Sequence, residues 1–168
     1  MPLNIYNIFQ QVIPELKLQN IPHGDDFEDF SEWMNESNQL FHYIELKEYY
    51  DNGIEDNFYL NQFKVNVDQL QNEIEADVSE IFDHVDEDVE DDDYDLDGQM
   101  DALEQVEEII FDKIKSVAVQ HQLTLIVIYR ENPYWLLVPT QDEEQLDQIV
   151  DTFNGVFNAD GDLNMAVY

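Results

Sequence analysis

The chain has 168 residues, and its 40 Asp and Glu against 6 Lys and Arg leave a formal net charge of −34. Hydrophobic residues make up 43% and aromatic residues 12%, more than a disordered acidic tail carries, so we expect a folded domain. The chain has no Cys, which excludes a disulfide framework and a thiolate metal site. A charge this large repels itself in the folded state, and solubility alone needs a charge of only about 2–8.

The N-terminus lacks a basic segment followed by an apolar core, and no apolar run approaches the roughly 18 residues of a membrane span. We therefore expect no signal peptide, no membrane insertion and a cytoplasmic location. An anionic membrane surface would also repel the protein.

Two short helices are predicted near the N-terminus. Apolar residues at helical spacing indicate a helix within the first thirteen residues, which Pro14 ends. A second helix is expected from Phe27, with Asp25 or Asp26 as its N-cap. Three later residues are read as a continuation of its apolar face: Phe41, Ile44 and Leu46.

Two longer amphipathic helices follow, each with an apolar residue every three or four positions. The first carries Phe63, Val67, Leu70, Ile74, Val78, Ile81 and Val85. The second, predicted over 99–120, carries Met100, Leu103, Val106, Ile110, Ile114 and Val117.

The pattern changes after residue 122. Two short β-branched and aromatic runs, 123–129 and 134–138, flank a turn and predict a hairpin. Thr140 and Glu143 form a capping box for a further helix, and 163–168 can add a third strand.

We therefore predict one α+β domain over residues 1–168. In it a mainly helical, acidic region (1–120) packs with a C-terminal β-β-α-β unit (121–168), which forms a small, mainly antiparallel sheet. Such a sheet needs a covering layer of helices, and the 99–120 helix is the candidate.

The negative charge is concentrated. Residues 65–112 are 48 positions with 20 carboxylates and no Lys or Arg, and 83–97 alone hold ten carboxylates in fifteen positions. A second cluster, 25–56, has eleven carboxylates against Lys47. A solvated helix face accounts for any single carboxylate, but such faces usually alternate Lys with Glu.

This density predicts a surface that seeks a cationic partner. If all of 65–112 were helical, its 20 carboxylates would follow one another at intervals of about 3.6 Å. The phosphates of a DNA strand are about 3.4 Å apart. We therefore expect a non-enzymatic interaction protein without a cofactor, which binds a basic protein rather than nucleic acid.

The partner would be a nucleic-acid-binding protein or a nuclease toxin, which makes this chain a nucleic-acid-mimic inhibitor or an immunity-type protein. The expected partner-binding residues are Asp83, Asp86, Glu87, Asp88, Glu90, Asp91 and Asp92. Exposed aromatic residues would anchor the interface, with four candidates: Tyr49, Tyr50, Tyr59 and Tyr94.

The alternative is a calcium site. Residues 93–104 resemble the twelve-residue EF-hand loop, with Gly98 at the sharp turn. That resemblance implies Ca²⁺ ligands at Asp93, Asp95, Asp97, Gln99 and Glu104. Asp97 is equally explained as the N-cap of a helix that begins at Gly98.

The sequence carries no catalytic signature. Its four His show no metal-ligand spacing, its five Gly form no phosphate-binding loop, and carboxylate pairs are too frequent to indicate acid–base chemistry. We therefore expect the protein not to be an enzyme.

Overall fold

The computed structural model describes residues 5–22, 26–48, 51–88, 96–130, 132–157 and 163–168, with backbone alone at 47, 82–88 and 96–101. Its α-helices are α1 (Ile5–Val12), α2 (Phe27–Met34), α3 (Phe58–Gln62), α4 (Val67–Asp88), α5 (Leu96–Gln120) and α6 (Glu143–Phe157). Its strands are β1 (Phe41–Tyr43), β2 (Thr124–Tyr129), β3 (Tyr134–Val138) and β4 (Asn164–Val167). Three short 3₁₀ helices, η1 (Pro14–Leu18), η2 (Leu46–Glu48) and η3 (Ile54–Asp56), lie between them.

The four strands form one antiparallel sheet in the order β1-β3-β2-β4. The predicted hairpin is confirmed as β2 and β3, with Ile126 opposite Leu136, and the predicted last strand is confirmed as β4. The α+β class, with a helical N-terminal region and a C-terminal β-β-α-β unit, is therefore confirmed.

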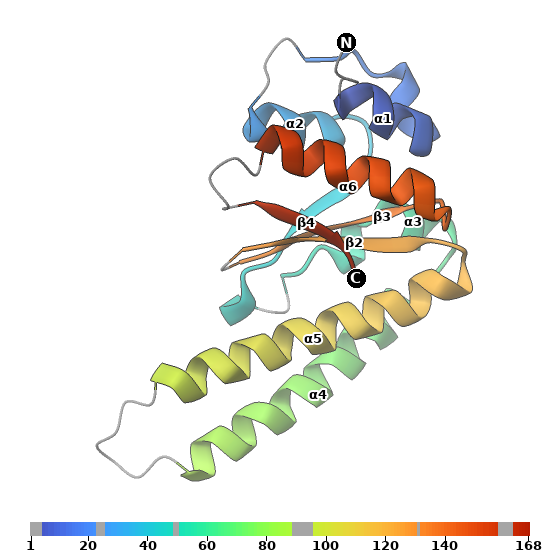
Figure 1. Cartoon of the computed structure of the whole chain (residues 1–168). Coiled ribbons are helices and arrows are strands. Elements are labelled where there is room, and N and C mark those ends of the chain that lie inside the picture. The colour runs from blue at the N-terminus through green and yellow to red at the C-terminus, as the bar shows by residue number, and fades with distance from the viewer. Residues whose placement is uncertain (1–4, 23–25, 49–50, 89–95, 131, 158–162) are drawn as a thin grey trace.

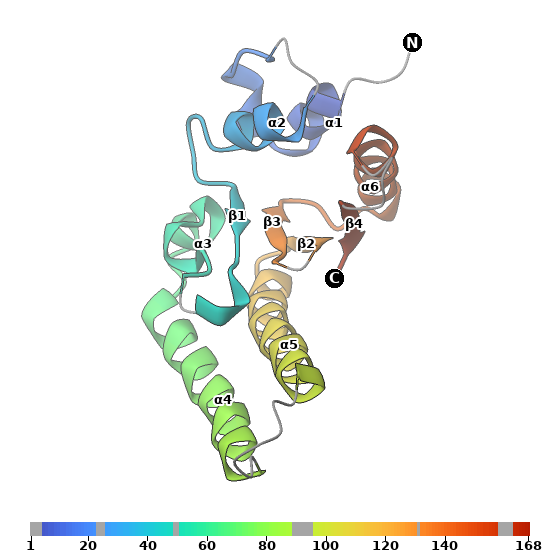
Figure 2. The ribbon, with the colours of Figure 1, turned by 90° about the vertical axis from the view of Figure 1, so that its left-hand side faces the viewer.

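The sheet lies between two layers of helices. Figure 1 shows α1, α2 and α6 on one side, and α5 with α4 on the other; Figure 2 shows the same separation from a second direction. The predicted role of α5 as a cover is confirmed by its contacts with β2. The second layer was not predicted, and it explains why β2 is apolar at successive positions: Leu125 to Ile128 are buried on both faces.

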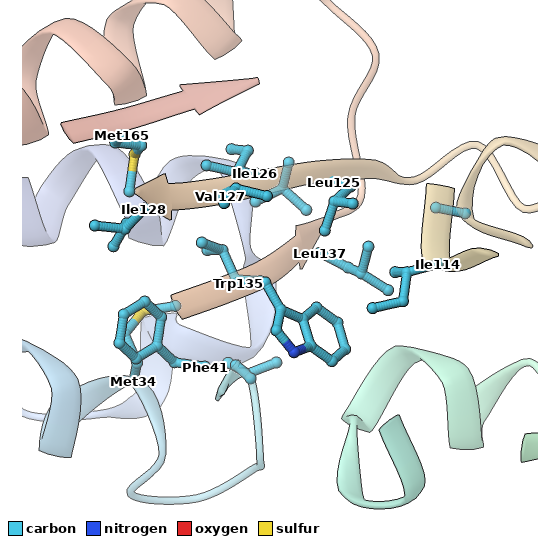
Figure 3. Packing of buried hydrophobic residues seen from close by; sticks show 14 of the residues in the cluster. Met34, Phe41, Ile114, Leu125, Ile126, Val127, Ile128, Trp135, Leu137 and Met165 are labelled. Atoms are coloured by element: carbon cyan, nitrogen blue, oxygen red, sulfur yellow. The ribbon is translucent and has the colours of Figure 1, made fainter. Parts of the chain in front are cut away.

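The buried side chains form one cluster that draws on both helical layers and the sheet. On the α5 side, Ile114 lies next to Leu137 of β3 (Figure 3). On the other side aromatic rings predominate: the Phe27 ring centroid is 5.1 Å from that of Tyr134 and 6.1 Å from that of Phe153. Burial of these rings, together with the aliphatic side chains of the same cluster, stabilises the fold.

One predicted helical segment is wrong, because Phe41 to Tyr43 form edge strand β1 instead of continuing a helix. Phe41 stacks on Tyr134 across the β1–β3 pair, with ring centroids 5.1 Å apart, and the N–H of Ile44 donates to the carbonyl of Pro133. Three residues are too few to show a strand period, so this pairing depends on contacts with a distant segment.

The start of the first long helix also differs from the prediction. Phe63 follows α3, a helix that was not predicted, and Lys64 has a left-handed φ of 57° that separates α3 from α4. The helix begins at Val67 after Asn66, whose Oδ1 accepts from the N–H of Gln69 at 3.0 Å. Phe63 is 42% exposed rather than part of the α4 stripe.

The N-cap of α6 lies two residues after Thr140, the residue expected to cap this helix. Asp142 is the capping residue, because its Oδ1 accepts from the N–H of Gln145 at 3.1 Å. Thr140 stabilises this arrangement by donating its hydroxyl to Oε1 of Gln145 at 2.7 Å and accepting from the N–H of Asp142 at 3.2 Å.

Gly53 has a φ of +83°, a left-handed conformation that disfavours other residues. A Cβ built at this position would lie 2.5 Å from Nδ1 of His42, whose ring is buried. The neighbouring Asn52 accepts a hydrogen bond from Nε1 of Trp135 through its carbonyl, at 2.7 Å. The 51–54 turn therefore attaches the N-terminal region to the sheet.

We predict that Gly53→Ala lowers the free energy of unfolding by about 2 kcal/mol, because it adds both backbone strain and a clash with His42. The matched control is Gly155→Ala on α6, where a Cβ would meet nothing within 4 Å. The control should raise stability by up to about 1 kcal/mol through helix propensity. Urea unfolding measures both, and equal effects of the two substitutions would contradict the packing described for Gly53.

Candidate partner-binding surface on helix α5

Helices α4 and α5 lie side by side, and their far ends extend away from the sheet (Figures 1 and 2). Their predicted apolar stripes are buried: Leu70, Ile74 and Val78 on α4, and Val106 and Ile110 on α5. Because the stripes occupy the inner faces, the acidic residues of the two helices are left toward solvent.

Four carboxylates within two and a half turns of α5 form an acidic surface. Glu104, Glu108 and Asp112 are exposed and follow at intervals of four residues, with Glu107 half-buried beside them. We call these four residues the α5 acidic face. Burial raises the pKa of the Glu107 carboxyl, and the charges of Glu104 and Glu108 raise it further. The carboxylates therefore repel one another at close range.

Two tyrosines border the α5 acidic face. Tyr129, at the end of β2, is 38% exposed, and burial and the charge of Glu107 raise its pKa. The hydroxyl of Tyr168 donates to Oδ1 of Asp112 at 2.8 Å, and burial together with this bond raises its pKa. Nζ of Lys115 lies 5.6 Å from the centroid of the Tyr168 ring. Phenol rings and carboxylates are thus combined on one surface.

The opposite flank of α5 is partly neutralised. Nζ of Lys113 lies 3.4 Å from Oδ2 of Asp77 and 3.9 Å from Oε2 of Glu73, both on α4. The cation relieves repulsion between two carboxylates one helical turn apart and links α5 to α4. Since these side chains are partly exposed, we expect the contribution to be below about 1 kcal/mol.

The predicted partner-binding residues are only partly covered by the structure. Asp83, Asp86, Glu87 and Asp88 belong to the last turns of α4, where backbone alone is described, and Glu90, Asp91 and Asp92 lie outside the described residues. Their role stays a prediction. The α5 acidic face belongs to the same acidic run, 65–112. It lies outside the densest segment, 83–97, which contains all the partner-binding residues predicted from the sequence.

Where the structure describes the predicted calcium site, its backbone is helical. Asp93 and Asp95 lie outside the described residues, whereas Asp97, Gln99 and Glu104 are all on α5, which begins at Leu96. In an EF-hand the ligands at positions 5 and 7, here Asp97 and Gln99, belong to the loop that turns around the ion rather than to the exit helix. Binding by these residues would require the first turns of α5 to unwind, and calcium binding stays a prediction from the sequence.

One expected aromatic anchor is wrong. Tyr59 is 3% exposed, its hydroxyl donates to Oε2 of Glu15 at 2.8 Å, and burial raises its pKa. Its partner is 44 residues away in the chain, so local sequence could not indicate this burial. Tyr49, Tyr50 and Tyr94 lie outside the described residues.

The chain matches no protein-family model, no curated protein and no solved structure. Among the described residues, no three or more His, Asp and Glu side chains are placed to hold a metal ion together. None of the helices in the described part of the chain combines the length and the apolar character needed to cross a membrane.

His42 is a buried titratable group with a structural explanation. Asn57 caps α3 with its Oδ1, which accepts from the N–H of Leu60, so its Nδ2 is turned to Nε2 of His42 at 3.0 Å. Nε2 must therefore accept, and the proton lies on Nδ1 of the neutral ring. The ring also lies 4.6 Å from that of Trp135. Burial lowers the pKa of His42 from 6.5 to about 4, although a backbone hydrogen bond with Gln39 opposes the shift.

The lowered pKa of His42 makes the stability of the protein depend on pH. The unfolded chain takes up the proton near pH 6.5 but the folded chain only near pH 4, so His42 contributes its full stability above pH 6.5. As the pH falls through this window we expect a loss of about 3 kcal/mol. Between pH 7 and pH 4.5, the free energy of unfolding measured in urea should therefore fall more for the unmodified protein than for His42→Gln. Parallel curves would contradict a neutral, buried His42, as would an imidazole proton shift that titrates near pH 6.5.

Proposed function

We propose that the protein is a non-enzymatic, highly acidic interaction protein that binds a basic protein surface. A nucleic-acid-mimic inhibitor and an immunity-type protein against a nuclease toxin are the kinds of protein that act in this way. The observation that carries the proposal is the α5 acidic face, which presents carboxylates at three successive turns beside Tyr129 and Tyr168.

The energetics of the α5 acidic face favour a cationic partner. Burial raises the pKa of Glu107, and the charges of Glu104 and Glu108 raise it further, so these carboxylates repel one another. Like charges at this spacing cost helix stability. A Lys or Arg from a partner would attract these carboxylates and reduce the repulsion between them. Both effects favour binding.

The position of the surface also supports protein recognition. The carboxylates lie on a 25-residue helix that packs on the sheet, so their spacing is held before the partner arrives. Tyr129 supplies an exposed aromatic ring of the kind that anchors protein interfaces. A net charge of −34 steers a basic partner over long distances at low salt and repels nucleic acid.

We predict that the immobilised protein captures a basic protein from a nuclease-treated extract at about 0.05 M salt and releases it at about 0.5 M. The triple variant Glu104→Gln, Glu107→Gln, Glu108→Gln should capture it at least roughly tenfold less efficiently, because the steering charge is removed at the contact. Its stability should be equal to or above that of the unmodified protein, since repulsion is removed without changing shape.

The matched control removes the same number of charges from exposed positions of α6: Glu144→Gln, Asp147→Asn and Asp151→Asn. This variant should capture the partner as the unmodified protein does. Failure to capture any basic protein at low salt, or capture unaffected by about 0.5 M salt, contradicts the proposed function. Equal losses in the two triple variants contradict the assignment to the α5 acidic face.

A further inference from the structure

The two edge strands of the sheet each have residues whose backbone groups face away from the sheet. The N–H of Tyr168 donates to the carbonyl of Leu125 at 3.0 Å, and in an antiparallel ladder such pairs recur at every second residue. Met165 and Val167 of β4 therefore face outward. By the same alternation, the bond from Ile44 to Pro133 turns Phe41 and Tyr43 of β1 outward.

At the β4 edge, the side chain of Asn154 bonds to both outward groups of Met165. Its Oδ1 accepts from the N–H of Met165 at 2.8 Å, and its Nδ2 donates to the carbonyl of Met165 at 3.0 Å. The amide thus makes the two bonds that a residue of an added strand would make. Asn154 is held in place by α6, which packs along β4.

The β1 edge has the same arrangement, from a different helix. The Oδ1 of Asn35 accepts from the N–H of Phe41 at 2.9 Å and from that of Leu40 at 3.0 Å, and its Nδ2 donates to the carbonyl of Phe41 at 2.8 Å. Asn35 is the C-cap residue of α2. Both helices lie in the layer on one side of the sheet, so this layer reaches both edges (Figures 1 and 2).

Two common protections of an edge strand, a charged residue and a proline, are missing from these two strands. Proteins commonly block strand addition with Lys, Pro or an inward-pointing charge on the edge strand. β1 reads Phe-His-Tyr and β4 reads Asn-Met-Ala-Val, with neither a charge nor a Pro. In low salt the charge of the whole molecule opposes self-association, but salt or a bound basic partner would screen it.

We propose that Asn35 and Asn154 close the two sheet edges to strand addition, and thereby keep a second copy of the chain from extending the sheet. Each strand is so short that it has two outward-facing residues, and the asparagine occupies one of them. An added strand then finds only Tyr43 or Val167 open, which is too little for a continuous ladder. The proposal does not depend on the proposed function.

The test compares Asn154→Ala with Gln148→Ala, which removes an exposed amide from the same helix. The probe is a fluorescent peptide with the sequence of residues 163–168, in about 0.5 M salt to screen the charge. We expect the peptide to bind Asn154→Ala and not the control, and the Met165 amide to exchange at least roughly tenfold faster in Asn154→Ala. Light scattering should show self-association of Asn154→Ala alone.

If Asn154→Ala is partly unfolded by circular dichroism, Asn154→Asp takes its place, because it still accepts from the N–H of Met165 but does not donate to its carbonyl. It should bind the peptide more strongly than the Gln148→Ala control. A folded Asn154→Ala or Asn154→Asp that remains monomeric and binds no peptide overturns the proposal. Changes in partner capture would bear on the α5 acidic face and not on this inference.

Discussion

The constraint on which the whole structure depends is that 40 carboxylates must stay in water around one apolar core. Among the described side chains, the buried polar ones are Gln19, His42, Asn52 and Asn57, and none of them is a carboxylate. His42 meets the same constraint by remaining neutral in a shell of Asn57, Trp135 and Gly53. Helices α4, α5 and α6 therefore each have one apolar and one acidic side, and the apolar sides pack into the common core.

This separation makes the long elements predictable from sequence. The stripes of α4 and α5 recur every three or four residues, and the hairpin of β2 and β3 is marked by β-branched runs on either side of a turn. The charged face of each helix must stay in water, so the apolar stripe is the face that packs in the core. The periodicity of the sequence therefore predicts the packing that the structure shows.

Shorter elements escaped prediction because partners far along the chain stabilise them. β1 has three residues and depends on Tyr134 and on the amide of Asn35, whereas α3 is separated from α4 by the left-handed Lys64. The candidate site shows the same division. Charge density located the acidic region, but the contribution of Tyr168 depends on its bond to Asp112, 56 residues away.

The acidic faces and the closed edges together define how the molecule can associate. Edge strands are the usual route by which sheets recruit another chain, and here asparagine amides occupy both. The helices remain, and on α5 the carboxylates are exposed beside two tyrosines. A partner is therefore expected to meet helical side chains rather than backbone, which makes its affinity depend on charge and on salt.

We propose that the negative charge is retained at a cost to folding, and therefore for an interaction. The most direct measurement is the free energy of unfolding in urea at pH 7 as NaCl is raised from about 0.05 M to about 0.5 M, which shortens the Debye length to a few ångströms. If the charge opposes folding, stability should rise steadily with salt as repulsion is screened. Stability that stays constant or falls would contradict the claim, because the carboxylates would then cost the folded state nothing.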